Sequence, residues 1–191
     1  MQRLNSVNPE LAEGRTKVLL DSVQQTFGTV PNTVKVIANS PAALESLLGF
    51  LQAMGSAEIG EKLHNQVKLS VSEANACDYC TSLLTAVGPQ AGLTADDILA
   101  GRKSSSEDLR TDAALKFAQA VLKNQGRVSD GELAAVREVG FSDGEIVEIV
   151  SSVVLGCFTN FLNHVADTEL DMPQAEPVQA CSTDATQACS V

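Results

Sequence analysis

Two cysteines separated by two residues, Cys77 and Cys80, form the pair whose spacing best suits chemistry. Asn75-Ala76 favours a break between helices, so we expect a new helix to begin near Cys77. Unpaired N–H groups and the helix dipole stabilise a thiolate at such a position, although the nearby Asp78 opposes a low thiol pKa. Two thiols at i and i+3 can form a disulfide with modest strain. The spacing therefore favours a dithiol that is oxidised by a substrate and reduced again.

Two other interpretations of the pair stay open. Two cysteines in a hydrophobic core would have the same spacing, and a zinc site would need two further ligands. The remaining candidate nitrogen and sulfur ligands are His64, His164, Cys157, Cys181 and Cys189. None of them repeats a ligand spacing. We therefore expect redox chemistry, with no metal and no cofactor.

Three further residues are candidates for supporting this chemistry. Glu73 lies four residues before Cys77 and either approaches the thiols or is a solvated acid at a helix end. The Tyr79 hydroxyl either orients a sulfur or a peroxide, or the ring only packs. His164 is the best candidate for a general base, because imidazole titrates near neutral pH. The alternative for His164 is a hydrogen-bonded role between helices.

Two other residues of reactive type are given structural roles. His64 is interpreted as a surface residue of its helix, and Cys157 as a small core residue in an apolar helix. Cys181 and Cys189 lie in a polar C-terminal stretch. They are either exposed bystanders or a mobile pair that exchanges electrons with Cys77 and Cys80.

The composition excludes several classes of function. The formal net charge is −11, without a basic cluster, which argues against nucleic-acid binding. No basic start precedes an apolar segment, and no uninterrupted apolar run approaches the length of a membrane span, so neither a signal peptide nor membrane insertion is expected. A cytoplasmic location is the default, and five cysteines in a reducing compartment are not a structural disulfide framework.

Helical periodicity dominates the chain, and no useful run alternates with period two. The sequence therefore predicts an all-α domain over residues 1–173, with eight or nine helices, and a disordered, flexible tail over residues 174–191. Serine or threonine followed three residues later by an acid marks three helix starts. The helix from about Asp143 to Leu170 is apolar nearly all round and should be central. The expected helices span about 9–27, 31–37, 41–54, 58–73, 77–87, 95–101, 107–123, 130–139 and 143–170.

Four separated stretches match one known pattern in order. They are Phe27–Asn32 with Ala38–Ala42, Glu73–Cys80 with Ala91–Ile98, Phe141–Ile146, and Phe158–Pro173. Together they resemble the AhpD-like core of the alkylhydroperoxidase and carboxymuconolactone decarboxylase superfamily, in its peroxidase-related branch. The resemblance covers roughly residues 8 to 173.

This resemblance implies an all-helical fold, homo-oligomers (dimers, trimers or hexamers) and thiol-dependent peroxide reduction by members with this cysteine pair. It also implies that Cys80 attacks and Cys77 resolves. The family pattern places a proton-relaying glutamate twelve residues before the first cysteine and a histidine four residues after the second. Asn65 and Leu84 occupy these positions here. The cysteines match the pattern, and both relay positions depart from it.

Two hypotheses from different classes follow. The first is a thiol oxidoreductase that reduces organic hydroperoxides or a partner disulfide and is regenerated by a thiol protein or a small thiol. The second is a catalytically degenerate member that senses redox state or serves as an oligomeric interaction module. Lactone decarboxylation is a weaker third hypothesis, because the cysteine pair marks the peroxidase side of the superfamily.

Overall fold

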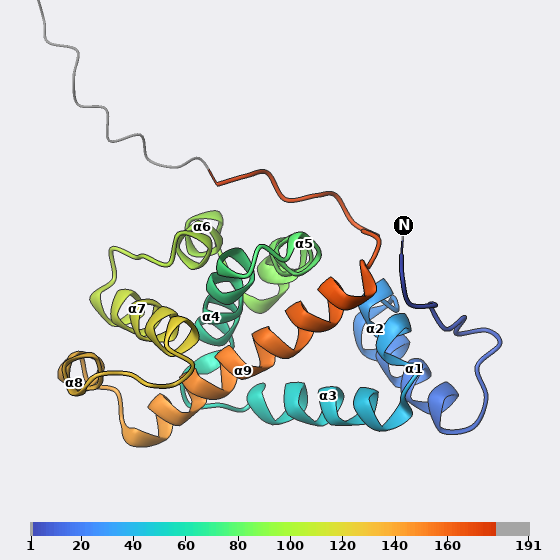
Figure 1. Ribbon diagram of the computed structural model, residues 1–191, viewed down its shortest axis with the longest axis horizontal. Coiled ribbons are helices and arrows are strands. Elements are labelled where there is room, and N and C mark those ends of the chain that lie inside the picture. Colours follow the sequence, from blue (N-terminus) through green and yellow to red (C-terminus); the bar gives the residue numbers. More distant parts are fainter. Residues whose placement is uncertain (1, 179–191) are drawn as a thin grey trace, which may run out of the picture.

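The computed structural model describes residues 2–178, which form nine α-helices and one short 3-10 helix without any strand (Figure 1). The predicted all-α fold is confirmed. The predicted tail begins inside this range, whereas Cys181 and Cys189 lie outside the described residues. The elements are α1 (Gly14–Phe27), α2 (Asn32–Ile37), α3 (Pro41–Met54), α4 (Gly60–Ala74), α5 (Asp78–Val87), η1 (Gly88–Ala91), α6 (Ala95–Lys103), α7 (Leu109–Lys123), α8 (Asp130–Glu138) and α9 (Asp143–Ala166).

Helix α9 runs through the middle of the molecule, as its apolar sequence predicts (Figure 1). Its first half packs with α4, α7 and α8 around Ile149 and Val153, which are almost fully buried. Further along, Leu155 belongs to a second core made with α1, α2 and α3. One helix thus contributes to both cores, and α4 packs along it and carries the chain into the cysteine pair.

Capping boxes start three of the helices at the predicted residues. Thr94, Ser129 and Ser142 each accept a hydrogen bond from the backbone N–H three residues on, and the acid at that position bonds back to the cap. Each box satisfies N–H groups that would otherwise lack partners at a helix start. Local sequence therefore fixes where these helices begin.

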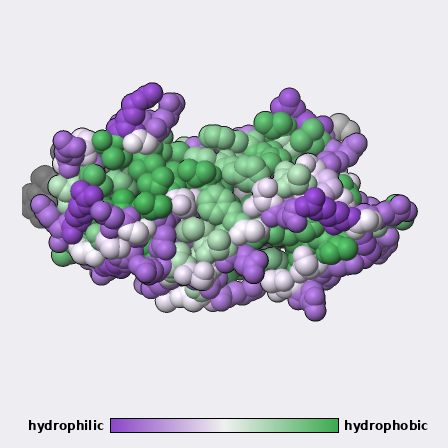
Figure 2. Space-filling model, turned by 90° about the horizontal axis from the view of Figure 1, so that it is seen from below, coloured by the Kyte–Doolittle hydropathy of each residue, from purple (hydrophilic) through white to green (hydrophobic). Residues whose placement is uncertain are grey.

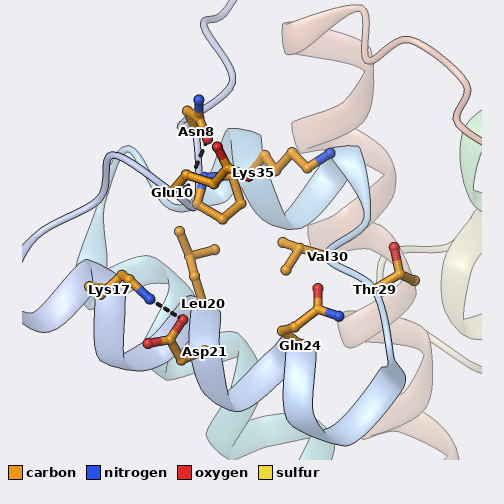
Figure 3. A pocket seen from close by; sticks show the side chains of 10 residues that line it. Asn8, Glu10, Lys17, Leu20, Asp21, Gln24, Thr29, Val30 and Lys35 are labelled. Atoms are coloured by element: carbon orange, nitrogen blue, oxygen red, sulfur yellow. Dashed lines mark hydrogen bonds and ion pairs between the residues drawn. The ribbon is translucent and has the colours of Figure 1, made fainter.

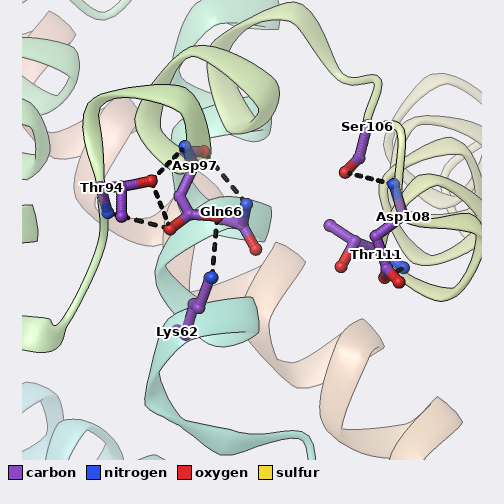
Figure 4. A network of polar contacts seen from close by, with 7 residues as sticks. All are labelled: Lys62, Gln66, Thr94, Asp97, Ser106, Asp108 and Thr111. Carbon is purple, nitrogen blue, oxygen red and sulfur yellow. Dashed lines mark hydrogen bonds and ion pairs between the residues drawn. The ribbon is translucent and has the colours of Figure 1, made fainter.

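Helix α6 is held on α4 by a small polar network around Asp97 (Figure 4). The Gln66 side-chain amide donates to the Asp97 carbonyl at 3.0 Å, and Lys62 Nζ lies 2.8 Å from its carboxylate. Gly101 makes the close approach possible, because a Cβ there would lie 3.0 Å from the Gln66 carbonyl oxygen. The network holds α6 against α4, which is the helix that leads into the cysteine pair.

Two predicted boundaries are wrong. The first helix does not begin at Asn8-Pro9, because the Asn8 side chain accepts from the Glu10 N–H at 2.9 Å and forms a local turn. Helix α1 starts only at Gly14. Helix α9 ends at Ala166 rather than Leu170, since Asp167 has a left-handed backbone with φ of 50°. The residues that follow Asp167 are thereby free to turn back toward α5.

Helix α9 has 24 residues and is long and apolar enough, by length and composition, to cross a membrane. The central helices of folded domains can have the same length and apolar composition. Here the helix starts with a capping box, carries Glu145 and Glu148 in its first two turns, and contributes to two cores. These features are typical of an internal helix of a globular fold.

The close packing of α4 on α9 gives a first prediction. A Cβ at Gly156 would lie 2.9 Å from Val71 Cγ1, and Val71 is fully buried. We expect Gly156→Ala to lower the free energy of unfolding by about 1–3 kcal/mol in urea titrations, because the helices must separate. The control is Gly49→Ala on α3, where a Cβ meets nothing within 4 Å. That control should be neutral or stabilising, and equal effects of both changes would contradict this packing argument.

Candidate active site

The turn between α4 and α5 places the first cysteine of the pair. The Ala76 and Cys77 N–H groups donate to the Glu73 and Ser72 carbonyls at 3.0 and 2.9 Å. This pattern closes a helix end and needs a left-handed residue, usually glycine. Ala76 takes that conformation with φ of 51°, at a cost of about 1–2 kcal/mol. The chain reverses sharply here, so that Cys77 becomes the N-cap of α5.

The two sulfurs lie together in the first turn of α5. Cys77 Sγ accepts from the Cys80 N–H at 3.4 Å, and Cys80 occupies the third helical position. No disulfide joins the two cysteines, and the residues are only 3% and 5% exposed. The predicted placement of the pair at a helix N-terminus therefore agrees with the structure.

The Cys80 sulfur lies among hydrogen-bond donors. The Asn163 side-chain amide of α9 donates to Cys80 Sγ at 3.2 Å. The Cys77 thiol is the strongest donor, and Asn160 and Thr159 add to it, so that the pKa of Cys80 is lowered to about 7 despite its burial. The thiolate is the reactive form of cysteine. The donors therefore favour the thiolate form of Cys80 near neutral pH.

Cys77 behaves in the opposite way. Its thiol donates to Cys80 and is buried, and both effects raise the pKa of Cys77 well above its usual range, with a small contribution from Asp78. One proton is thus held by Cys77 and shared toward the Cys80 thiolate. This asymmetry makes Cys80 the sulfur that ionises more readily and Cys77 the sulfur that stays protonated.

A second layer of polar contacts fixes the donors of Cys80. Asn160 is fully buried, accepts from the Asn75 side chain at 2.9 Å and donates to Ser72 Oγ at 3.1 Å. These contacts tie α9 to the end of α4. Neither Asn160 nor Asn163 is predicted from the sequence as a partner of the cysteine pair. The usable signal was two asparagines three apart on a helix that is otherwise apolar.

Tyr79 joins the pair to the segment that follows α9. Its hydroxyl accepts from the Thr33 N–H at 3.1 Å and donates to Asp171 Oδ1 at 2.8 Å. Burial raises the pKa of Tyr79, so the phenol keeps its proton. Met172 packs against Cys77 and Cys80, and the Ala175 N–H donates to Ser82 Oγ at 3.0 Å. Residues 171–175 thus cover the dithiol.

The structure does not bring the other two predicted catalytic residues to the sulfurs. Glu73 forms an ion pair with Arg102 of α6, and His164 is exposed at the end of α9. Asn163, the residue before His164, is the one that contacts Cys80. Helical geometry explains this, because adjacent residues on a helix point in directions about 100° apart.

His64 is not the surface residue that the sequence suggests. It is 4% exposed, and its Nδ1 lies 2.8 Å from Ser152 Oγ, which itself donates to the Glu148 carbonyl. Because the serine hydroxyl donates elsewhere, it accepts from His64 Nδ1–H. Burial, aided by the positive charge of Lys68, lowers the pKa of His64 to about 3. His64 is therefore neutral near pH 7.

Among the residues that the structure describes, neither a cavity nor a cluster of metal-binding side chains coincides with the cysteine pair. A pocket of about 420 Å³ lies between the N-terminal turn, α1 and α2 (Figure 3), and none of the site residues lines it. Within residues 2–178, no three His, Cys, Asp or Glu side chains gather as metal ligands would. Cys77 and Cys80 therefore remain the candidate site in the described part of the chain.

Solved structures of other proteins share this arrangement of helices. An uncharacterized peroxidase-related protein from Silicibacter sp. TM1040 matches with a TM-score of 0.72 and 19% identity, over 88% of this chain and 94% of that one. A Ralstonia eutropha JMP134 protein described as an alkylhydroperoxidase AhpD core matches with a TM-score of 0.73 and 21% identity, over 89% and 92% of the two chains. The chain has the AhpD-like fold. The predicted resemblance to peroxidase-related proteins is thus confirmed by the fold.

The AhpD-like fold also occurs in proteins with other chemistry. The debrominase Bmp8, solved with 2,3,4-tribromopyrrole, matches with a TM-score of 0.76 and 17% identity, over 90% of this chain and 93% of that one. No protein-family model and no curated relative matches the sequence. The activity must therefore be argued from the dithiol itself.

Proposed function

We propose that this protein is a thiol oxidoreductase of AhpD-like fold that reduces organic hydroperoxides with Cys80 and Cys77. The observation that carries the proposal is the surrounding of Cys80 Sγ, which accepts from Asn163 at 3.2 Å and from the Cys77 thiol. These donors stabilise a thiolate near neutral pH. A thiolate adjacent to a second thiol is the arrangement that two-cysteine peroxide reduction requires.

The reaction would run in two steps. The Cys80 thiolate attacks the terminal oxygen of the hydroperoxide, the O–O bond breaks, and Cys80 becomes a sulfenic acid. The other oxygen leaves as an alkoxide, which takes up a proton to become the alcohol. The Cys77 sulfur then attacks the Cys80 sulfur and forms a disulfide, and the hydroxyl departs as water with the Cys77 proton. A thiol protein or a small thiol reduces the disulfide by exchange, in a reducing compartment such as the cytoplasm.

Turnover tests the proposal. With dithiothreitol as the reductant, catalytic amounts of the protein should accelerate consumption of cumene hydroperoxide well above the rate with dithiothreitol alone. The remaining hydroperoxide can be measured by iron oxidation. Consumption at the rate of the reductant alone would contradict peroxidase function, whatever the reactivity of the cysteines toward other reagents.

A second candidate is a degenerate, redox-sensing or interaction protein. Asn65, at the position of the family glutamate, donates to the Glu61 carbonyl at 3.0 Å and accepts from Lys68. Leu84, at the position of the family histidine, packs with Leu69 and Leu93. Neither side chain exchanges a proton. A protein that forms the disulfide but does not turn over would support this candidate.

We also propose that the protein is a homo-oligomer that assembles through α9. The face that lies below in Figure 1, where α3 and the first half of α9 run, carries a broad apolar band (Figure 2). Five α9 side chains with spacings of 7, 4, 3 and 4 residues lie 37–63% exposed in one stripe: Val147, Val154, Phe158, Phe161 and Val165. Such a heptad-like stripe is typical of helix pairing, and a second copy of this chain presents a matching one.

Sedimentation velocity tests this assembly. A charge in the middle of the stripe, Val154→Glu, should reduce the mass to that of a monomer, because it would bury an unpaired carboxylate. Leu109→Glu is the control, since Leu109 is 77% exposed on α7 and lies outside the stripe. Unchanged mass for Val154→Glu, or an equal effect of the control, would contradict assembly through α9.

A further inference from the structure

Helix α4 carries a half-buried lysine, Lys68, in the stretch that leads to the cysteine pair. Lys68 is one turn after His64 and one turn before Ser72. Both of those residues contact α9, His64 through Ser152 and Ser72 through Asn160. Since residues four apart share a helix face, Lys68 lies on the side of α4 that faces α9, the helix whose Asn163 contacts Cys80.

The Lys68 side chain is half-buried, and its Nζ donates to Asn65 Oδ1 at 3.4 Å. Within residues 2–178, no ion pair joins Lys68 to a carboxylate. Its charged and titratable neighbours are Cys80 of α5 and Glu61 and His64 of α4. Nearby negative charge stabilises a half-buried ammonium group, and both Cys80 and Glu61 favour the charged form of Lys68, Cys80 more than Glu61.

The acidity of Lys68 suits proton transfer. Burial lowers the pKa of Lys68 to about 8, against the opposing effects of Cys80 and Glu61. A group that titrates close to the working pH is both a cation and a usable proton donor. The neutral His64 does not compete for this role, because its pKa is lowered to about 3.

We propose that Lys68 is the counter-charge of the Cys80 thiolate and the proton donor to the oxygen that leaves when Cys80 attacks a hydroperoxide. The second role rests on the proposed function, whereas the first does not. Lys68 would then supply the proton that neither Asn65 nor Leu84 can give.

The proton balance closes over one cycle. Cys80 S⁻ and ROOH give Cys80–SOH and RO⁻, with an S–O bond formed and the O–O bond broken. Lys68 gives its proton to RO⁻, which leaves as the alcohol ROH. Cys77–SH and Cys80–SOH then give the disulfide and water. Reduction by a dithiol returns one hydrogen to the Cys77 thiol and one proton to Lys68, so each cycle consumes one hydroperoxide and two thiols.

The test separates charge from proton donation with two variants. Lys68→Met removes both, whereas Lys68→Arg keeps the charge on a group that does not give up its proton. The first measurement is the pH profile of Cys80 alkylation by iodoacetamide, followed by peptide mass spectrometry. Lys68→Met should move its midpoint up by about one pH unit, and Lys68→Arg should leave it in place.

The second measurement is the rate of oxidation by cumene hydroperoxide at pH 7. Both variants should slow it by about 10²-fold, the usual contribution of a positioned acid. Lys62→Met is the control, because Lys62 is on the same helix but 54% exposed and paired with Asp97. Thermal melting checks that each variant is folded.

Three results would overturn the inference or part of it. An unchanged alkylation midpoint in Lys68→Met would remove the counter-charge role. Full oxidation rates in Lys68→Arg would remove the proton-donor role. If the wild-type protein ignores hydroperoxides, the proposed function fails together with the proton-donor role, while the alkylation profile still decides whether Lys68 supports the thiolate.

Discussion

In the Cys80→Ser variant we expect hydroperoxide consumption to fall to the rate of the reductant alone, a loss of at least about 100-fold. Serine keeps the shape of the side chain but carries no thiolate near neutral pH. The donors around this position, Asn163 among them, would then surround a neutral hydroxyl that cannot attack the peroxide. The measurement is turnover with dithiothreitol, for variant and wild type together.

Cys77→Ser should give a different result. Its hydroxyl can still cap α5 and donate to Cys80, so the first attack should persist. Without a resolving thiol the sulfenic acid should accumulate, and dimedone should trap it on Cys80. Cys157→Ser, which changes a half-buried thiol outside the pair, should turn over as the wild type does. Loss of the first attack in Cys77→Ser, with retention in Cys80→Ser, would reverse the assigned roles.

We expect the free energy of unfolding to fall as the pH is lowered below 6.5. Burial lowers the pKa of His64 from its ordinary value of 6.5 to about 3 in the folded protein. Below pH 6.5 the unfolded chain binds a proton at this residue that the folded protein does not. Stability therefore falls as the pH falls, by about 1.5 kcal/mol between pH 6.5 and pH 5 from this group alone. The measurement is urea unfolding at several pH values in that window.

Other titratable groups change the free energy of unfolding little between pH 6.5 and pH 5. The Cys80 thiolate, with a pKa of about 7, loses most of its effect above pH 6.5. Carboxylates with lowered pKa, such as Glu132 beside the Ser129 N–H, lose theirs only below about pH 4.5.

The chain contains two histidines, so a matched pair of variants is available. His64→Gln keeps a donor for Ser152 without the titration and should flatten the pH dependence. His164→Gln, on an exposed residue, should keep it. A slope that survives in His64→Gln would show that another group carries the acid sensitivity.

Local signals predicted much of the fold. The capping boxes at Thr94, Ser129 and Ser142 mark helix starts with side chains three residues apart, so no tertiary information is needed. The start of α1 is predicted wrongly because another local hydrogen bond is possible at the same residues. Asn8 and Pro9 are good helix-start residues, but Asn8 makes an equally local turn with Glu10. Sequence alone does not decide between these two local hydrogen bonds.

The local geometry of the cysteine pair can be predicted where it depends on spacing, but not where it depends on the packing of distant helices. Cys77 and Cys80 follow from their separation and from the helix start. Asn163 reaches Cys80 only because α9 packs beside α5, and Lys68 of α4 feels the charge of Cys80 for the same kind of reason. His164 looked the better base by residue type, yet one position along a helix turns a side chain from the dithiol to solvent. Residue type indicates what chemistry a side chain can do, but the packing of the helices decides which side chain lies beside the dithiol.

The most direct test of the central claim is the rate at which Cys77 and Cys80 form a disulfide after mixing with an alkyl hydroperoxide. Stopped-flow measurement at pH 7, with mass spectrometry of the quenched protein, gives this rate. An activated Cys80 thiolate predicts oxidation about 100-fold faster than that of a small free thiol under the same conditions, and no such disulfide in Cys80→Ser. Oxidation no faster than the free thiol would contradict the peroxidase assignment and favour a protein that uses this fold for redox sensing or assembly.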